Sequence, residues 1–169
     1  MRLFRASGLT HIEFGTESFC DRTLEAYGKH FTFGDVVRAS RLALDEGVYY
    51  AHFLILGGYG DTRENVRETI ENSRRMEYTV MFPYAGMRIY PHTRLAELAA
   101  KEGAIGRDDD LMAPSYYISR DFDLEEVRRA ALATGKAWVF PDDPQSALAD
   151  TLRLKRNKKG PLWEYLRKP

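Results

Sequence analysis

Short apolar runs alternate with amphipathic stretches along the first two-thirds of the chain. The strongest run, residues 50–56 (YAHFLIL), predicts a β-strand, and weaker runs at 11–14 and 79–82 predict two more. In the segments 35–46 and 63–76, apolar positions recur near the 3.6-residue period of a helix. The order strand, helix, strand, helix, strand is typical of α/β folds with parallel strands.

Capping residues mark where these helices begin and end. Thr32, Thr62 and Thr93 each precede a helical pattern, as N-cap residues do, and Gly47 and Gly103 stand where a helix should stop. Thr93 opens a third helix that continues through Lys101. The sequence thus predicts a partial (β/α) barrel with about three parallel strand–helix units.

The pattern changes after Gly103. We predict two parts: residues 1–119, which hold the strand–helix units, and residues 120–169, a mainly helical C-terminal extension. Three parallel strands alone form a small sheet with two open edges, so either the extension or strands from elsewhere should cover them. The extension is expected to contain helices at 123–134, 144–157 and 161–167 and an edge strand at 137–140.

Composition and charge narrow the classes of function. The 25 basic and 25 acidic side chains balance, so no net field attracts nucleic acid or anionic lipid. No apolar run approaches the roughly 20 residues of a membrane helix, and the first residues lack the apolar core of a secretory signal. The single cysteine, Cys20, excludes an internal disulfide and favours a reducing, cytoplasmic location. We therefore expect neither a nucleic-acid nor a membrane partner.

Polar and glycine-rich loops follow each of the three predicted strands. These loops span residues 15–18, 57–62 and 87–93. In parallel α/β folds, ligands bind at the carboxyl ends of the strands, where such loops meet. The sequence therefore predicts a small-molecule site at this rim.

The three loops also carry a resemblance to a known family. EFGTES, then HFLILGGYGDT, then GMRIYPHT with LAELAAKEG, resemble in order and spacing the second half of the radical S-adenosylmethionine core, a partial (β/α)6 barrel. The resemblance covers about residues 9–119 and is greatest to the branch whose members often carry an N-terminal cobalamin-binding domain. It implies a parent enzyme that cleaves S-adenosylmethionine with a [4Fe–4S] cluster and uses the resulting radical to abstract hydrogen, with cobalamin as a possible further cofactor.

The resemblance implies cofactor-binding roles for five residues. Glu17 and Ser18 match positions that bind the ribose and amino-acid parts of S-adenosylmethionine, and the alternative is that they cap a helix. Ile55, Leu56 and Gly57 match the segment that contacts adenine. Two departures put the contacts of that segment in doubt: Tyr59 replaces a frequent proline, and Asp61 replaces a glutamate. The alternative there is an ordinary strand-to-helix turn capped by Thr62.

Substrate contact is implied for Arg88 and Tyr90, in the loop after the third strand. A guanidinium grips carboxylates or phosphates in a bidentate fork, although Arg88 could equally belong to a structural ion pair. His52 and His92 are weaker candidates, and we expect both to be structural.

The family's cluster is held by three cysteines in the spacing C-x-x-x-C-x-x-C, and this sequence has only Cys20. We expect Cys20 to be buried and inert, and no metal site in this chain. The cluster would then belong to the parent only. The resemblance thus implies a fragment that is inactive without the missing N-terminal half or a complementary cysteine-rich chain.

Two other classes of function stay open from the sequence. One is a phosphate- or nucleotide-binding α/β protein that uses the glycine loop and Arg88. The other is a non-catalytic interaction module that forms a homodimer through an open sheet edge. A basic run at 153–159 is expected to be a solvated helix end.

Overall fold

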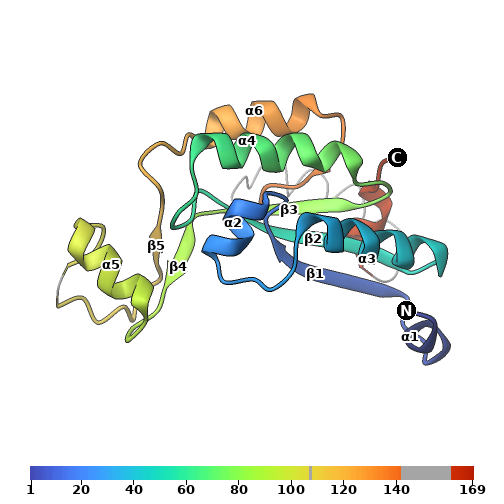
Figure 1. Ribbon diagram of the computed structural model, residues 1–169, viewed down its shortest axis with the longest axis horizontal. Helices are drawn as coiled ribbons and strands as arrows, with labels where there is room; N and C mark the ends of the chain where they lie inside the picture. The colour runs from blue at the N-terminus through green and yellow to red at the C-terminus, as the bar shows by residue number, and fades with distance from the viewer. Residues whose placement is uncertain (107, 142–160) are drawn as a thin grey trace.

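Four parallel strands form the central sheet of the computed structural model, which describes residues 1–106, 108–141 and 161–169 (Figure 1). The strands are β1 (His11–Glu17), β2 (Tyr49–Leu56), β3 (Val80–Ala85) and β6 (Ala137–Trp138), in the order β1-β2-β3-β6. The α/β class, the parallel direction and the edge strand near residue 137 are as the sequence predicts.

Two strands run further than their apolar patterns indicate. β1 continues through Gly15 to Glu17, with a shift in its register against β2 between these two residues. β3 continues through Pro83 to Ala85. Proline lacks the N–H that a central strand needs, but β6 pairs only with Val80 and Met81, so Pro83 lies where β3 has a neighbour on one side alone.

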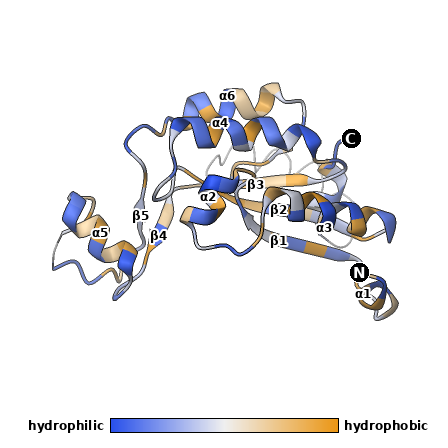
Figure 2. Cartoon of the chain, viewed as in Figure 1, coloured by the Kyte–Doolittle hydropathy of each residue, from blue (hydrophilic) through white to orange (hydrophobic). Residues whose placement is uncertain are grey.

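One face of the sheet is covered by α3 (Phe33–Asp45), α4 (Arg63–Asn72) and α6 (Leu124–Ala133). Side chains from these helices join the helix-facing residues of β2 and β3 in one buried cluster. Figure 2 shows the apolar stretches along these helices and strands. The short α2 (Asp21–Ala26) and the 3-10 turn η1 (Ser73–Arg75) complete the connections between strands.

The helix boundaries follow the predicted caps. Thr32 and Asp35 form a reciprocal capping box at α3, and the Thr62 hydroxyl accepts a hydrogen bond from the amide of Asn65 at α4. Thr93 caps α5 (Arg94–Glu102) in the same way, and Gly103 ends that helix in the left-handed conformation. These three caps and the glycine stop confirm the predicted boundaries.

An arm projects from the carboxyl ends of the sheet strands (Figure 1). It consists of the antiparallel pair β4 (Met87–Ile89) and β5 (Ser115–Tyr117), together with α5. Its own small core contains Ile89, Ala99, Leu111 and Tyr117. The sequence indicated only a loop at β4, so the arm is a feature that the pattern did not predict.

The C-terminal segment packs on the face of the sheet opposite the helices. The 3-10 helix η2 (Leu162–Leu166) brings Trp163 against Ala51, Val80 and Ala137. The Nε1 of Trp163 donates a hydrogen bond to the carboxylate of Glu13 at 2.9 Å. A short terminal helix was predicted here and is present as a 3-10 helix.

Some expectations are left as they were. The predicted helix at 144–157 and the basic run at 153–159 lie outside the described residues, and the division at residue 119 stays a prediction.

The helix α1 (Arg2–Ala6) buries none of its side chains. Among the described helices, none has the length and apolar character needed to span a membrane.

Candidate functional site

Half of the sheet face opposite the helices carries no covering segment among the described residues. Strand alternation separates the two faces: His52 lies between Thr16 and Ser40 on the helix side, whereas Phe53 stacks on Phe82 on the other side. We call the uncovered half, at the carboxyl ends of the strands, the open face; it comprises Gly15, Glu17, Phe53, Ile55, Phe82 and Tyr84.

Three aromatic rings lie in a row on this open face. The ring centroids of Phe53 and Phe82 lie 5.0 Å apart, and those of Phe53 and Tyr84 lie 6.1 Å apart. The planes are inclined by only 21° and 16°, so the rings are close to parallel. Tyr84 is 41% exposed. A flat ligand can extend such a row by stacking on its exposed member, Tyr84.

Glu17 brings a carboxylate to the edge of the same face. Its Oε1 lies 3.7 Å from the Cβ that a side chain at Gly15 would have, so the carboxylate folds back over the open face. It pairs with Nζ of Lys29 at 3.1 Å, with both side chains partly exposed. The backbone of Glu17 has φ 68°, in the left-handed region that non-glycine residues rarely adopt. Strain of this kind occurs most often at functional sites.

Ser18 turns in the opposite direction, into the protein. Its hydroxyl is hydrogen-bonded to that of Thr69 at 2.8 Å and accepts the amide of Cys20 at 3.0 Å. Ser18 and Cys20 are both buried, as predicted for Cys20. The hydroxyl of Ser18 therefore holds the turn after β1, and only Glu17 of the predicted pair reaches the open face.

The glycine turn after β2 is filled by protein side chains. A Cβ on Gly57 would lie 2.4 Å from the ring of Phe122, and one on Gly58 would lie 2.3 Å from the hydroxyl of Tyr27. The amide of Gly57 donates to the carboxylate of Asp61 at 2.9 Å, and burial raises the pKa of that carboxyl. Close packing explains these glycines, and a ligand role for Gly57 stays a prediction.

The other two adenine-contact candidates point to opposite faces of the sheet. Leu56 is buried in the core under the helices, so its side chain does not reach the rim. Ile55 is partly exposed on the open face, next to the aromatic row. The structure therefore brings together Glu17, Ile55, Phe53 and Tyr84. Sequence reasoning missed Phe53 and Tyr84, because they lie on different strands, β2 and β3, and only the pairing of these strands brings their rings together.

Arg88 and Tyr90 lie on the arm and contact each other. The guanidinium carbon of Arg88 lies 4.8 Å from the centroid of the Tyr90 ring, and both side chains are exposed. Arg88 forms no ion pair with any carboxylate of the described residues, so its alternative role in a structural pair has no support. Both stay predicted substrate contacts, placed beyond the strand ends.

The two histidines differ in environment. His52 is fully buried, with Nδ1 2.6 Å from the Thr16 hydroxyl and Nε2 3.2 Å from that of Ser40. Burial lowers its pKa to about 3, so it is neutral at physiological pH. This confirms the structural role expected for His52. His92 is exposed on the arm, with φ 60°.

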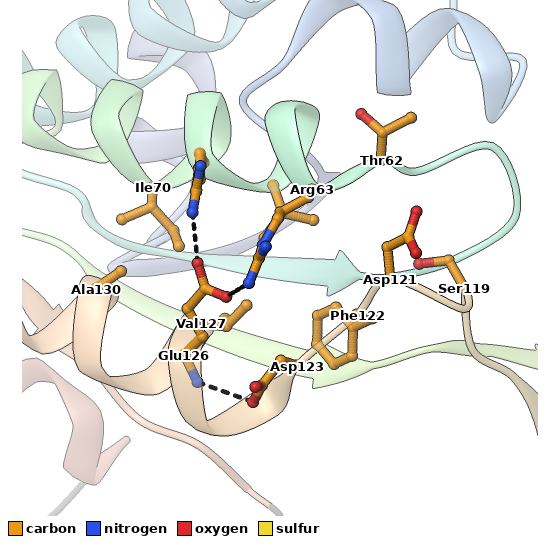
Figure 3. Close-up of a pocket in the computed structure, with 12 residues that line it drawn as sticks. Thr62, Arg63, Ile70, Ser119, Asp121, Phe122, Asp123, Glu126, Val127 and Ala130 are labelled. Atoms are coloured by element: carbon orange, nitrogen blue, oxygen red, sulfur yellow. Dashed lines mark hydrogen bonds and ion pairs between the residues drawn. The ribbon is translucent and has the colours of Figure 1, made fainter.

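A hollow between α4 and α6 serves packing instead of binding (Figure 3). Its volume is about 20 Å³, close to the room that one water molecule needs. Glu126 points between two arginines of α4: it pairs with Arg67 at 2.7 Å and also with Arg63. These arginines lower the pKa of the Glu126 carboxyl. The arrangement clamps the two helices together.

The residues present fit one part of the expected cofactor set. A [4Fe–4S] cluster needs cysteine thiolates, and the sequence offers one cysteine, which is buried. The described residues contain no group of three or more His, Cys, Asp and Glu side chains placed to hold a metal. A flat heterocycle with hydroxyl groups, in contrast, fits a stacking surface with a carboxylate acceptor at its edge.

Comparisons with known proteins were made for sequence and fold. No family model matches the sequence. The chain is 28% identical over 96 residues to an uncharacterised methyltransferase of Pyrococcus horikoshii, which covers 54% of this chain and 21% of the relative. It is 33% identical over 72 residues to the anaerobic magnesium-protoporphyrin IX monomethyl ester cyclase of Rubrivivax gelatinosus, over 43% of this chain and 13% of the cyclase.

Solved structures give a longer match. The radical S-adenosylmethionine methyltransferase TsrM of Kitasatospora setae, with tryptophan and an aza analogue of S-adenosylmethionine bound, superimposes with a TM-score of 0.69 and 18% identity. The match covers 98% of this chain and 42% of TsrM. Elp3 of Methanocaldococcus infernus matches with a TM-score of 0.54 and 17% identity, over 81% of this chain and 30% of Elp3.

These matches confirm the predicted resemblance at the level of the fold. The chain has the fold of part of a radical S-adenosylmethionine enzyme, and it spans less than half the length of each of the proteins named above. TsrM has also been solved with cobalamin and a [4Fe–4S] cluster bound, which agrees with a cobalamin-associated branch.

Proposed function

We propose that this chain forms the adenosine-binding wall of a radical S-adenosylmethionine enzyme and is inactive alone. The observation that carries the proposal is the open face itself, where a strained carboxylate lies beside a row of partly exposed aromatic rings. Glu17 would accept hydrogen bonds from ribose hydroxyls, and Ile55 with the aromatic row would contact adenine. Ser18, Leu56 and Gly57 would act through their backbone or by shaping the turns.

The cofactor carries the difficult chemistry: S-adenosylmethionine, reduced by an iron–sulfur cluster, supplies a carbon radical that abstracts hydrogen. This chain lacks the thiolates for the cluster, so the proposal requires a second, cysteine-rich part. That part is the missing N-terminal half or a complementary chain. Cobalamin in the parent enzyme is included in the proposal, because the similar fold of TsrM binds it.

The free edge of β1 supports the existence of such a part. Within the part of the chain that the structure describes, β1 has one strand neighbour, β2, and a parallel sheet is normally extended and buried on both faces. Gly15 is exposed on this strand, and a second strand beside it would cover it. A second copy of the chain could use the same edge. Sedimentation equilibrium distinguishes the two: we expect a monomer that dimerises weakly, and a tight dimer would favour the interaction module.

Binding to S-adenosylhomocysteine, a stable product of the cofactor, tests the adenosine wall directly. In a ¹H–¹⁵N NMR titration we expect shifts at Glu17, Phe53, Ile55 and Tyr84. Glu17→Gln should weaken binding by roughly fivefold to tenfold, because a neutral amide is a poorer acceptor for two hydroxyls than a carboxylate. Glu71→Gln, on an exposed pair with Arg74, is the matched control and should change nothing.

Equal affinities for the two variants, or shifts that avoid the open face, would contradict the adenosine wall. The inactivity of the isolated chain has a separate test. Under reducing conditions, after reconstitution with iron and sulfide, the chain alone should form no 5′-deoxyadenosine. Formation of that product by the purified chain would disprove the requirement for a second part.

A further inference from the structure

A cleft of about 250 Å³ lies between the body of the protein and the arm. It is separate from the open face and shares no lining residue with it. The body contributes Tyr27, at the end of α2, and Tyr59, in the turn after β2. The arm contributes Met87 of β4 and one side of α5, with Arg94, Leu95 and Leu98.

Both tyrosines are fixed by contacts outside the cleft. The hydroxyl of Tyr27 approaches the backbone of Gly58 so closely that a Cβ there would lie 2.3 Å away. Burial of this hydroxyl raises the pKa of Tyr27 far above its ordinary value. The ring of Tyr59 meets the ring of Tyr117 edge-on at 5.4 Å. The cleft therefore has two aromatic walls whose positions do not depend on a ligand.

Of the described residues that line the cleft, Arg94 alone is charged. Among the described residues, no carboxylate lies within ion-pair distance of its guanidinium. Arg94 is also the first residue of α5, where the helix dipole favours an anion. An apolar, partly aromatic cleft with a single free cation at its edge is complementary to an apolar ligand with a single negative group.

The size of the cleft limits the apolar part of such a ligand. A cavity of about 150 Å³ holds benzene, so 250 Å³ accommodates a fused pair of rings. Met87 adds a polarisable sulfur, which contacts aromatic rings favourably. From these features we propose that the cleft binds a flat bicyclic aromatic carboxylate, with its rings against Tyr27, Tyr59 and Met87 and its carboxylate on Arg94.

Titration with naphthalene-2-carboxylate tests this proposal on the chain as it is. We expect saturable binding, with NMR shifts at Tyr27, Tyr59 and Leu95. The neutral analogue naphthalene-2-methanol should bind roughly tenfold more weakly, and Arg94→Gln should cost the carboxylate a similar factor, because each removes the charge-assisted contact. Arg129→Gln, an exposed arginine of α6, is the matched control and should bind like the parent chain.

Leu98→Trp provides a second variant that leaves Arg94 in place. The larger side chain would fill the cleft and abolish binding of the carboxylate, while S-adenosylhomocysteine binding at the open face should not change. The proposal is overturned if the alcohol binds as tightly as the acid, if Arg94→Gln and Arg129→Gln behave alike, or if Leu98→Trp retains full affinity. Because the second ligand reports on the open face, a failure here is distinguishable from a failure of the adenosine wall.

Discussion

Glu17 joins a strained backbone to a carboxylate at the edge of the open face. A left-handed conformation costs an ordinary residue about 1–2 kcal/mol, and glycine adopts it freely. We therefore expect Glu17→Gly to keep the stability of the parent chain within about 1 kcal/mol, while removing the binding group. Glu17→Val should lose about 2 kcal/mol or more, because a β-branched residue is least tolerated there.

Urea unfolding of the two variants measures these differences. A large loss of stability in Glu17→Gly would mean that the ion pair with Lys29, and not binding, accounts for this residue. Retained stability with lost nucleoside binding would assign the strain to function.

His52 makes the stability of the fold depend on pH. Its folded pKa is about 3, against 6.5 for a free histidine. Between these values the unfolded chain binds a proton that the folded chain does not, so the free energy of unfolding decreases as the pH falls. This decrease in the free energy of unfolding is at most about 1.4 kcal/mol per pH unit. It begins as the pH falls below 6.5 and is complete near pH 3.

Denaturation at several pH values between 7.5 and 4.5 tests this dependence. The glutamine of His52→Gln does not titrate. The difference in the free energy of unfolding between the parent chain and this variant should therefore become smaller as the pH falls. A constant difference would show that the imidazole takes up a proton in the folded chain as readily as in the unfolded chain.

At the scale of elements, the turn between β2 and α4 depends on its glycines. Gly57 has φ 74° and faces the Phe122 ring, whereas Gly28 has φ 71° and nothing within 4 Å of its missing Cβ. Gly28→Ala should therefore lower the free energy of unfolding by only about 1 kcal/mol, which is the cost of a left-handed backbone for alanine. Gly57→Ala should cost about 3 kcal/mol, because the clash with the ring is added.

Chemical unfolding of both variants gives the comparison, and a double-mutant cycle identifies the cause. If the ring is responsible, Phe122→Ala will restore part of the stability lost in Gly57→Ala. Equal losses in Gly57→Ala and Gly28→Ala would exclude the close packing of this turn.

The strand–helix units were predictable because their signals are local. Periodicity and the caps at Thr32, Thr62 and Thr93 lie within a few residues of the boundaries that they set. The pairing of β4 with β5 joins segments separated by α5, and no local pattern specifies it. The loop motif after β1 indicated Glu17 and Ser18 together. It could not predict that Ser18 turns inward, because the hydroxyl of Ser18 bonds to Thr69, which is 51 positions away in the sequence.

At the scale of the molecule, the C-terminal segment closes the sheet. Trp163 is 8% exposed and joins Ala51, Val80 and Ala137, and Lys168 forms a bridge with Thr79. Trp163→Ala should destabilise the protein by about 3 kcal/mol, and Trp163→Phe by about 1, since phenylalanine loses mainly the hydrogen bond to Glu13.

Thermal or urea unfolding measures both losses. Leu132→Ala on α6 is the control; this side chain is 57% exposed and should contribute less than about 0.5 kcal/mol. A loss for Trp163→Ala no larger than that of the control would mean that the segment is not an integral part of the fold.

The position of Trp163 has a kinetic consequence for any enzyme assembled on this chain. It covers the amino-terminal half of the sheet face, so within the described residues the open face is approached from the carboxyl ends of the strands. A nucleoside and a substrate that both arrive from this side share one route. We therefore expect the nucleoside, which would contact the sheet itself, to bind before the substrate, and product-inhibition patterns should show an ordered addition.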